Sequence, residues 1–143
     1  MATLPGSVLF ACTLNSIRSP MAAALMRKLH GSRVFVDSVG VRAGTVDPFA
    51  VTVMAEIGID ISAHQSKNFD ELDDTSFDLV VSLSPDAQHT AIELTRASAC
   101  EVEFWPVFDP TAVEGNRTET LAAYRLVRDQ LQKRILERFP RNG

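Results

Sequence analysis

The stretch VLFACTLNSIRSPMAAAL, residues 8–25, passes from an apolar run into a helix within a few positions. Its beginning, SVLFAC (7–12), is rich in strand-forming residues and predicts a buried strand. SPMAAALMRKLHG (19–31) predicts a helix. The expected cap, first residue and end of this helix are Ser19, Pro20 and Gly31. A short loop that carries Cys12 and Arg18 therefore joins the predicted strand to the predicted helix.

The same order of strand and helix repeats along the rest of the chain. The composition and periodicity predict further strands at 33–40, 77–83 and 100–105, and further helices at 47–58, 84–97 and 116–139. Asp47, Ser84 and Asn116 stand where helix caps are expected. This alternation predicts one α/β domain over residues 1–143, with three layers: a four-stranded parallel sheet and helices on both of its faces. Such sheets bind ligands beyond the carboxyl ends of their strands, where the Cys12 loop is expected.

Length and composition exclude several classes of protein. The chain has 143 residues, 45% hydrophobic residues and a net charge of -4, which is typical of a single soluble domain and argues against binding to nucleic acid. The apolar run at 8–11 is too short for a signal peptide or a membrane span, so we expect a cytoplasmic protein with no membrane partner. Two cysteines and three unclustered histidines favour neither a disulfide framework nor a metal site, and no cofactor is expected.

The residues of the first loop fit the binding of a phosphate-like dianion. Backbone N–H groups at the start of a helix converge on one point, and Arg18 adds a planar pair of donors. The same field favours the thiolate form of Cys12, placed for attack on phosphorus and formation of a cysteinyl-phosphate. The Ser19 hydroxyl is expected to face this thiolate. The competing hypothesis is that Cys12 is a small buried hydrophobic residue, as many cysteines are.

The segment CTLNSIRSP resembles the phosphate loop of the low-molecular-weight protein tyrosine phosphatase superfamily, which also contains thioredoxin-coupled arsenate reductases. The matching positions are Cys12, Asn15, Arg18, Ser19 and Pro20. DSVG (37–40), EIGIDISAHQS (56–66) and FDLVVSLS (77–84) also resemble segments of that superfamily, so the resemblance covers nearly the whole chain.

The resemblance implies a set of site residues. Cys12 is the nucleophile, Arg18 binds phosphate, and Asp109 of the Asp109-Pro110 pair is a general acid that later activates water. An acid is needed because a tyrosine leaving group has a pKa near 10. A structural alternative is that Asp109 merely caps a turn, as Asp47-Pro48 does. The predicted substrate-binding residues are Thr13, Leu14, Asn15, Ser16, Ile17, Arg18 and Ser19, with Asn15 and Ser19 holding the loop.

Three functions remain open on this basis. The first is a phosphomonoester phosphatase, with a phosphorylated tyrosine protein or a small phosphomonoester as partner and a monomer or weak homodimer as its state. The second is an arsenate reductase that uses an external thiol, because Ser84 and Ala91 stand where the superfamily's reductases carry relay cysteines. The third is a non-catalytic anion-binding module. Like Ser84 and Ala91, Ile17 stands where the superfamily often carries a cysteine, here the second cysteine of the loop.

Several further residues carry specific expectations. No aromatic residue follows Asp109-Pro110 closely, so Phe49 and Trp105 are candidates for another wall of the site, although core packing is favoured for Trp105. His64 is expected to make a structural hydrogen bond. Cys100 is expected on the fourth strand and buried. Tyr124 belongs to the apolar stripe of the last helix, with Leu121, Val127, Leu131 and Ile135.

Overall fold

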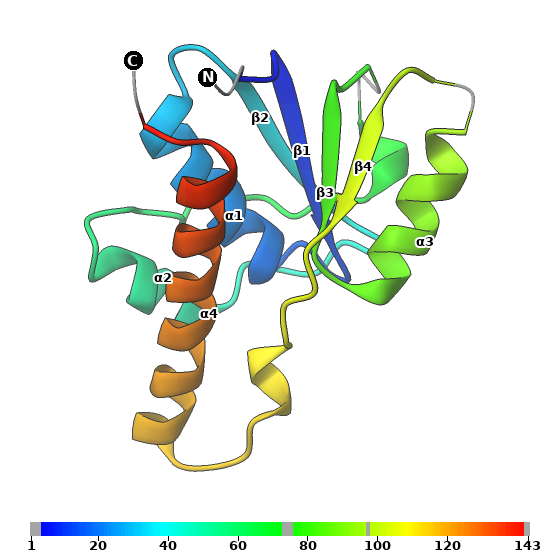
Figure 1. Cartoon of the computed structure of the whole chain (residues 1–143). Helices are drawn as coiled ribbons and strands as arrows, with labels where there is room; N and C mark the ends of the chain where they lie inside the picture. Colours follow the sequence, from blue (N-terminus) through cyan, green and yellow to red (C-terminus); the bar gives the residue numbers. More distant parts are fainter. Residues whose placement is uncertain (1–3, 73–75, 97, 142–143) are drawn as a thin grey trace.

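A four-stranded parallel sheet forms the centre of the computed structural model, which describes residues 4–72, 76–96 and 98–141. The strands lie in the order β2-β1-β3-β4 (Figure 1). Their bounds are β1 (Ser7–Cys12), β2 (Phe35–Gly40), β3 (Leu79–Ser82) and β4 (Glu101–Phe104). Cys12, the last residue of the inner strand β1, lies opposite Gly40 at the end of β2. The predicted parallel sheet is confirmed, and its carboxyl edge gathers the ends of all four strands.

Helices cover both faces of this sheet, which gives the predicted three layers (Figure 1). The helices are α1 (Arg18–His30), α2 (Pro48–Ala55), α3 (Pro85–Leu94) and α4 (Arg117–Arg138), with short 3-10 turns η1 (Phe69–Glu71) and η2 (Pro110–Ala112). Helix α4 packs against α1 and α2 on one face, whereas α3 packs against β1 and β3 on the other. The described helices include none that is both long and apolar enough to cross a membrane.

Alternating side chains of β1 supply both halves of the core. Val8, Phe10 and Cys12 join the cluster under α1, α2 and α4, while Leu9 and Ala11 join the cluster under α3. All five are at most 2% exposed. A fully buried aliphatic or aromatic side chain contributes about 1.5–3 kcal/mol, so this strand is held from both sides. The alternation also directs the Cys12 thiol to the side of the sheet where α1 begins.

The capping residues confirm most of the predicted helix starts. Asp47 accepts a hydrogen bond from Phe49 N, Ser84 from Ala87 N, and Asn116 forms a capping box with Glu119. These side chains satisfy N–H groups that have no partner inside the helix.

Helix α1 differs from its prediction, because it begins at Arg18 and no side chain caps it. Ser19 is therefore not the cap. Its hydroxyl is instead occupied by Cys12 and Asn15. The helix ends at His30, directly before the predicted Gly31.

Near β4, the structure contradicts the prediction for Cys100 and confirms the prediction for Trp105. Cys100 precedes the strand and is partly exposed, so the prediction of a buried strand residue is wrong. Trp105 is buried and packs edge-on against Phe10, with ring centroids 6.1 Å apart, which confirms core packing for it. The predicted end of the third helix at residue 97 lies outside the described residues, and α3 ends at Leu94.

Candidate active site

A cavity of about 160 Å³ opens at the carboxyl edge of the sheet, beside the loop that follows β1. The described residues that line it are Cys12, Thr13, Leu14, Ser16, Ile17, Arg18, Asp47, Asp109 and Thr111. The three predicted catalytic residues thus share one cavity, although about 90 positions separate Arg18 from Asp109. Of the predicted substrate-binding residues, Asn15 and Ser19 do not line the cavity. Both side chains are fully buried.

Ser19 lies against the thiol, as the sequence predicts. Its Oγ is 2.9 Å from Cys12 Sγ, and the hydroxyl is fully buried. The same Oγ accepts a hydrogen bond from Asn15 Nδ2 at 2.8 Å. Since Asn15 supplies a donor to Ser19, the hydroxyl hydrogen is available for the sulfur or for the carbonyl of Val39, which lies 3.2 Å away. A hydroxyl donor next to the sulfur stabilises the anionic, nucleophilic form.

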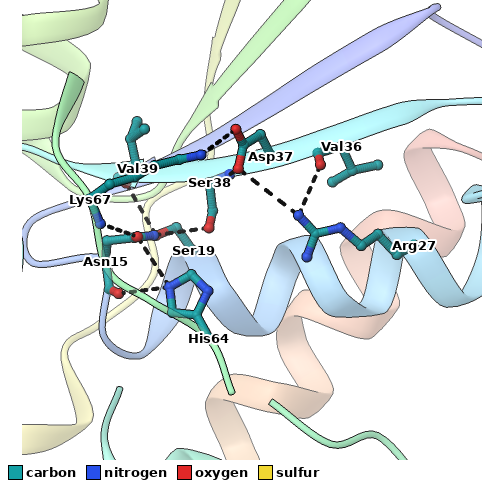
Figure 2. Close-up of polar contacts among 9 residues, drawn as sticks. All are labelled: Asn15, Ser19, Arg27, Val36, Asp37, Ser38, Val39, His64 and Lys67. Carbon is teal, nitrogen blue, oxygen red and sulfur yellow. Dashed lines mark hydrogen bonds and ion pairs between the residues drawn. The ribbon is translucent and has the colours of Figure 1, made fainter. Parts of the chain in front are cut away.

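Asn15 is the residue that fixes the shape of the loop. It has φ of 54°, the left-handed conformation that asparagine tolerates better than most residues. Its Nδ2 donates to Ser19 and to Ser38 Oγ, the latter at 3.0 Å (Figure 2). Its Oδ1 accepts from Lys67 N at 3.0 Å and from His64 Nε2 at 3.1 Å. Every polar group of this buried side chain is therefore paired, so the loop has one conformation that satisfies them all.

The segment that follows Ile61 makes hydrogen bonds to the backbone of Asn15. Ser66 Oγ donates to the Asn15 carbonyl at 2.5 Å, and His64 Nε2 lies 3.2 Å from the same oxygen. This confirms the structural hydrogen bond predicted for His64. Burial lowers the pKa of His64 below its ordinary 6.5, so its neutral form is favoured. Lys67 Nζ, from the same segment, pairs with Asp37 of β2 at 2.6 Å (Figure 2).

The start of α3 clamps the other side of the loop. Thr13 Oγ1 donates to Asp86 Oδ1 at 2.9 Å, and Ser84 Oγ donates to the same oxygen at 2.7 Å. Burial works in the opposite direction, but the hydrogen bonds from Ser84 and Thr13 leave the pKa of Asp86 below its ordinary value. Asp86 was missed by the sequence analysis, where the only signal was its place in the Ser-Pro-Asp opening of a helix.

Arg18 connects the loop to the segment that carries Asp109. Its Nη2 donates to Thr13 Oγ1 at 3.3 Å, and its Nη1 donates to the carbonyl of Val107 at 3.0 Å. Arg18 is only 8% exposed and still lines the cavity. A buried arginine held by two oxygen acceptors is placed to bind an oxyanion without losing much conformational entropy.

Both sequence interpretations of Asp109 agree with its surroundings. Its Oδ1 accepts from Thr111 N at 2.9 Å and from Thr111 Oγ1 at 2.7 Å, so Asp109 caps η2. The residue is also exposed and lines the same cavity as the Cys12 loop. The turn therefore orients the carboxyl group instead of competing with a role in the site.

Asp47 and Tyr124 are two features of the site that the sequence analysis did not assign to it. Asp47 lines the cavity, its N–H donates to the Ser16 carbonyl at 3.0 Å, and its Oδ2 accepts from Tyr124 Oη at 2.9 Å. Burial, the hydrogen bond to Asp47 and the charges of Asp47 and Asp109 all raise the pKa of Tyr124. Phe49, a candidate wall, does not line the cavity. Its ring packs against Tyr124 at 5.4 Å.

The two cysteines lie at opposite edges of the sheet. Cys12 ends β1, while Cys100 comes directly before β4, whose first residue is in register with Leu79 of β3 and Val8 of β1. At about 3.3 Å per residue, they are separated by about 16 Å along the strands, and by about 10 Å more across two strand spacings. A disulfide needs Cα atoms within about 7 Å. Since the chain has no other cysteine, Cys12 has no partner thiol within it.

Comparisons with known proteins agree with this geometry. Residues 7–137 match the family described as low molecular weight phosphotyrosine protein phosphatase. An arsenate reductase of Halalkalibacterium halodurans is 40% identical over 128 residues, which are 90% of this chain and 91% of that protein. A solved structure described as an arsenate reductase in the phosphate binding state superposes with a TM-score of 0.76 at 29% identity, over 92% of this chain and 94% of that one. The YwlE arginine phosphatase of Geobacillus stearothermophilus gives a TM-score of 0.76 at 26% identity, over 94% of this chain and 90% of its own.

Proposed function

The chain belongs to the low molecular weight phosphotyrosine protein phosphatase family, and from this premise we propose that it reduces arsenate through Cys12, with an external small thiol as reductant. The observation that carries the proposal is the cavity beside Cys12. It is about 160 Å³ in volume, and none of the described residues that line it is aromatic. A cavity of this size, lined by Arg18 at the start of α1, suits an inorganic oxyanion better than a phenyl ring.

The reaction needs only one cysteine of the chain. Cys12 Sγ attacks arsenic and one arsenate oxygen leaves as water, so that a sulfur–arsenic bond replaces an oxygen–arsenic bond. An external thiolate then attacks Sγ, the electron pair of the sulfur–arsenic bond stays on arsenic, and arsenite leaves. A second external thiol releases Cys12 from the mixed disulfide by exchange. Two thiols are oxidised to one disulfide for each arsenate reduced.

The residues around Cys12 have separate parts in this sequence. Arg18, which lines the cavity, binds the oxyanion, and Ser19, whose Oγ lies 2.9 Å from Cys12 Sγ, stabilises the thiolate. Asp109, which lines the same cavity, protonates the departing oxygen. The relatives named arsenate reductase support the proposal, and the distance between Cys12 and Cys100 is the reason that the reductant is external.

Hydrolysis of a phosphomonoester is the second candidate, and the position of Asp109 favours it. A carboxyl group in the same cavity as the nucleophile can serve a phosphatase as acid and then as base. Phosphotyrosine is the less favoured substrate, because the expected aromatic wall is not formed by Phe49 or by the buried Trp105. A non-catalytic role would require an inert Cys12.

One experiment separates these functions. Purified protein is incubated with arsenate and a series of thiols, and separately with an aryl phosphate without thiol, and arsenite and phosphate release are measured. We expect arsenite formation that depends on added thiol, from the wild type and not from Cys12→Ser. Phosphate release without arsenite would establish the second candidate and overturn the first.

A further inference from the structure

Asp47 lines the same cavity as Cys12 and Arg18, so a carboxylate shares this space with the nucleophilic sulfur. Among the described residues that line this cavity, Arg18 is basic, whereas Asp47 and Asp109 are acidic. A second reactant that reaches Cys12 while an oxyanion is bound there therefore shares the cavity with these two carboxylates. The net charge of -4 on the whole chain acts in the same direction, because it disfavours the approach of anions.

The structure fixes Asp47 more firmly than a helix cap requires. Its N–H is bonded to the loop carbonyl of Ser16, its Oδ1 accepts from Phe49 N at 2.8 Å, and its Oδ2 accepts from the buried Tyr124. A carboxylate has about four acceptor positions, and these two donors occupy about half of them. The remaining capacity is available to a donor inside the cavity.

Tyr124 keeps this carboxylate oriented. The tyrosine is 2% exposed, and its hydroxyl is a neutral donor because burial and then the nearby carboxylates raise its pKa. It therefore supplies a hydrogen bond to Asp47 without supplying a positive charge. Within the part of the chain that the structure describes, Asp47 makes its side-chain contacts with Phe49 N and Tyr124 Oη and with no cationic group, so its negative charge is available to a ligand.

We propose that Asp47 is a specificity-determining residue that selects a small thiol with a positively charged group, such as a protonated amine, as the second reactant at Cys12. The inference rests on the proposed function, since it names the class of thiol used there. A cationic thiol places its charge beside Asp47 while its sulfur reaches Cys12. An anionic thiol meets the same carboxylate with repulsion, and a neutral one is unaffected.

The test uses disulfides as probes of Cys12, so it does not require arsenate turnover. Cystamine is cationic, 2-hydroxyethyl disulfide is neutral and 3,3′-dithiodipropionate is anionic. In each exchange the Cys12 thiolate attacks one sulfur of the probe, a mixed disulfide forms, and the other half leaves as a thiolate. Rates are followed by intact-protein mass spectrometry, and peptide mapping separates Cys12 from Cys100.

The decisive variant is Asp47→Asn, because asparagine is a good helix cap and keeps the shape of the side chain. We expect the cystamine rate to fall by about three- to tenfold, the rate of the anionic probe to rise, and the neutral rate to stay within about twofold. Tyr124→Phe keeps the carboxylate and should preserve the preference for the cationic probe. Glu93→Gln, a loss of one negative charge on the exposed face of α3, is the matched control and should change none of the rates.

Two results would overturn the inference. Equal changes of all three rates in Asp47→Asn would assign Asp47 a purely structural role, and unchanged rates would assign it none. If the charge preference is found while arsenate is not reduced with any thiol, Asp47 selects cationic reactants and the proposed function alone is wrong.

Discussion

Replacing Asn15 by alanine should destabilise the protein more than any other single change in the loop, and replacing it by glycine should destabilise it slightly less. The side chain makes hydrogen bonds to Ser19, Ser38, Lys67 N and His64, all lost in both variants. The two variants differ in the backbone. At φ of 54°, alanine is strained and glycine is not.

The magnitudes follow from these contacts. At about 1 kcal/mol net for each hydrogen bond, the loss of four lowers the free energy of unfolding by about 4 kcal/mol in either variant. Alanine adds about 1 kcal/mol for the left-handed conformation. A loss of this size is a large fraction of the usual 5–15 kcal/mol of a domain. For a chain of this length, 1 kcal/mol corresponds to about 4 °C, which is the expected gap in Tm between the two variants.

Urea and thermal unfolding followed by circular dichroism measure both values, and the rate of Cys12 alkylation reports whether the loop has kept its shape. The expected order of stability is wild type, Asn15→Gly, Asn15→Ala. Equal stability of the two variants would refute the argument from φ. An Asn15→Ala variant within about 1 kcal/mol of the wild type would refute the argument from the buried network.

Three other changes test separate parts of the site. Cys12→Ser should abolish turnover of arsenate and of aryl phosphate while phosphate binding, measured by calorimetry, survives. Asp109→Asn should slow release of a basic leaving group by about a hundred- to ten-thousand-fold and a good leaving group much less, and equal slowing of both would exclude a general acid. Peroxide should oxidise Cys12 beyond the sulfenic acid, and a Cys12–Cys100 disulfide in mass spectra would contradict the placement of Cys100. Because the pKa of His64 is lowered in the folded protein, the neutral form is favoured there, and the free energy of unfolding should fall as the pH drops below about 6.5. A His64→Gln variant whose Tm changes with pH between 5.5 and 7.5 as steeply as that of the wild type would argue against this.

The order of elements and the parallel sheet were predictable from sequence because hydrophobic pattern and caps are local signals. Asp47, Ser84 and Asn116 each cap the helix that they precede. Ser19 was misassigned as a cap for a physical reason. The same hydroxyl that suits a cap is bonded to Cys12, and no local pattern distinguishes these partners.

The residues of the cavity that were missed are those whose role depends on distant contacts. Asp47 resembles any Asp-Pro cap until Tyr124, 77 positions later, is seen to donate to it. Asp86 similarly reaches Thr13 across 73 positions. The loop itself was predictable because its chemistry is contained within Cys12 to Ser19, whereas the opposite wall is assembled by the fold.

The order in which the strands are made has a consequence for the thiol. Strand β1 is the first in the chain but an inner strand of the sheet, and its neighbour β3 follows Cys12 by roughly 70 residues. At about 5–20 residues per second, a ribosome needs about 3 to 14 s to make that interval. Pairs so distant in sequence also form slowly during refolding, because their loops must close first. Cys12 is thus made early and enclosed late during synthesis, and it is also enclosed late during refolding. The yield of active protein on refolding should therefore depend on a reductant that is present from the first seconds.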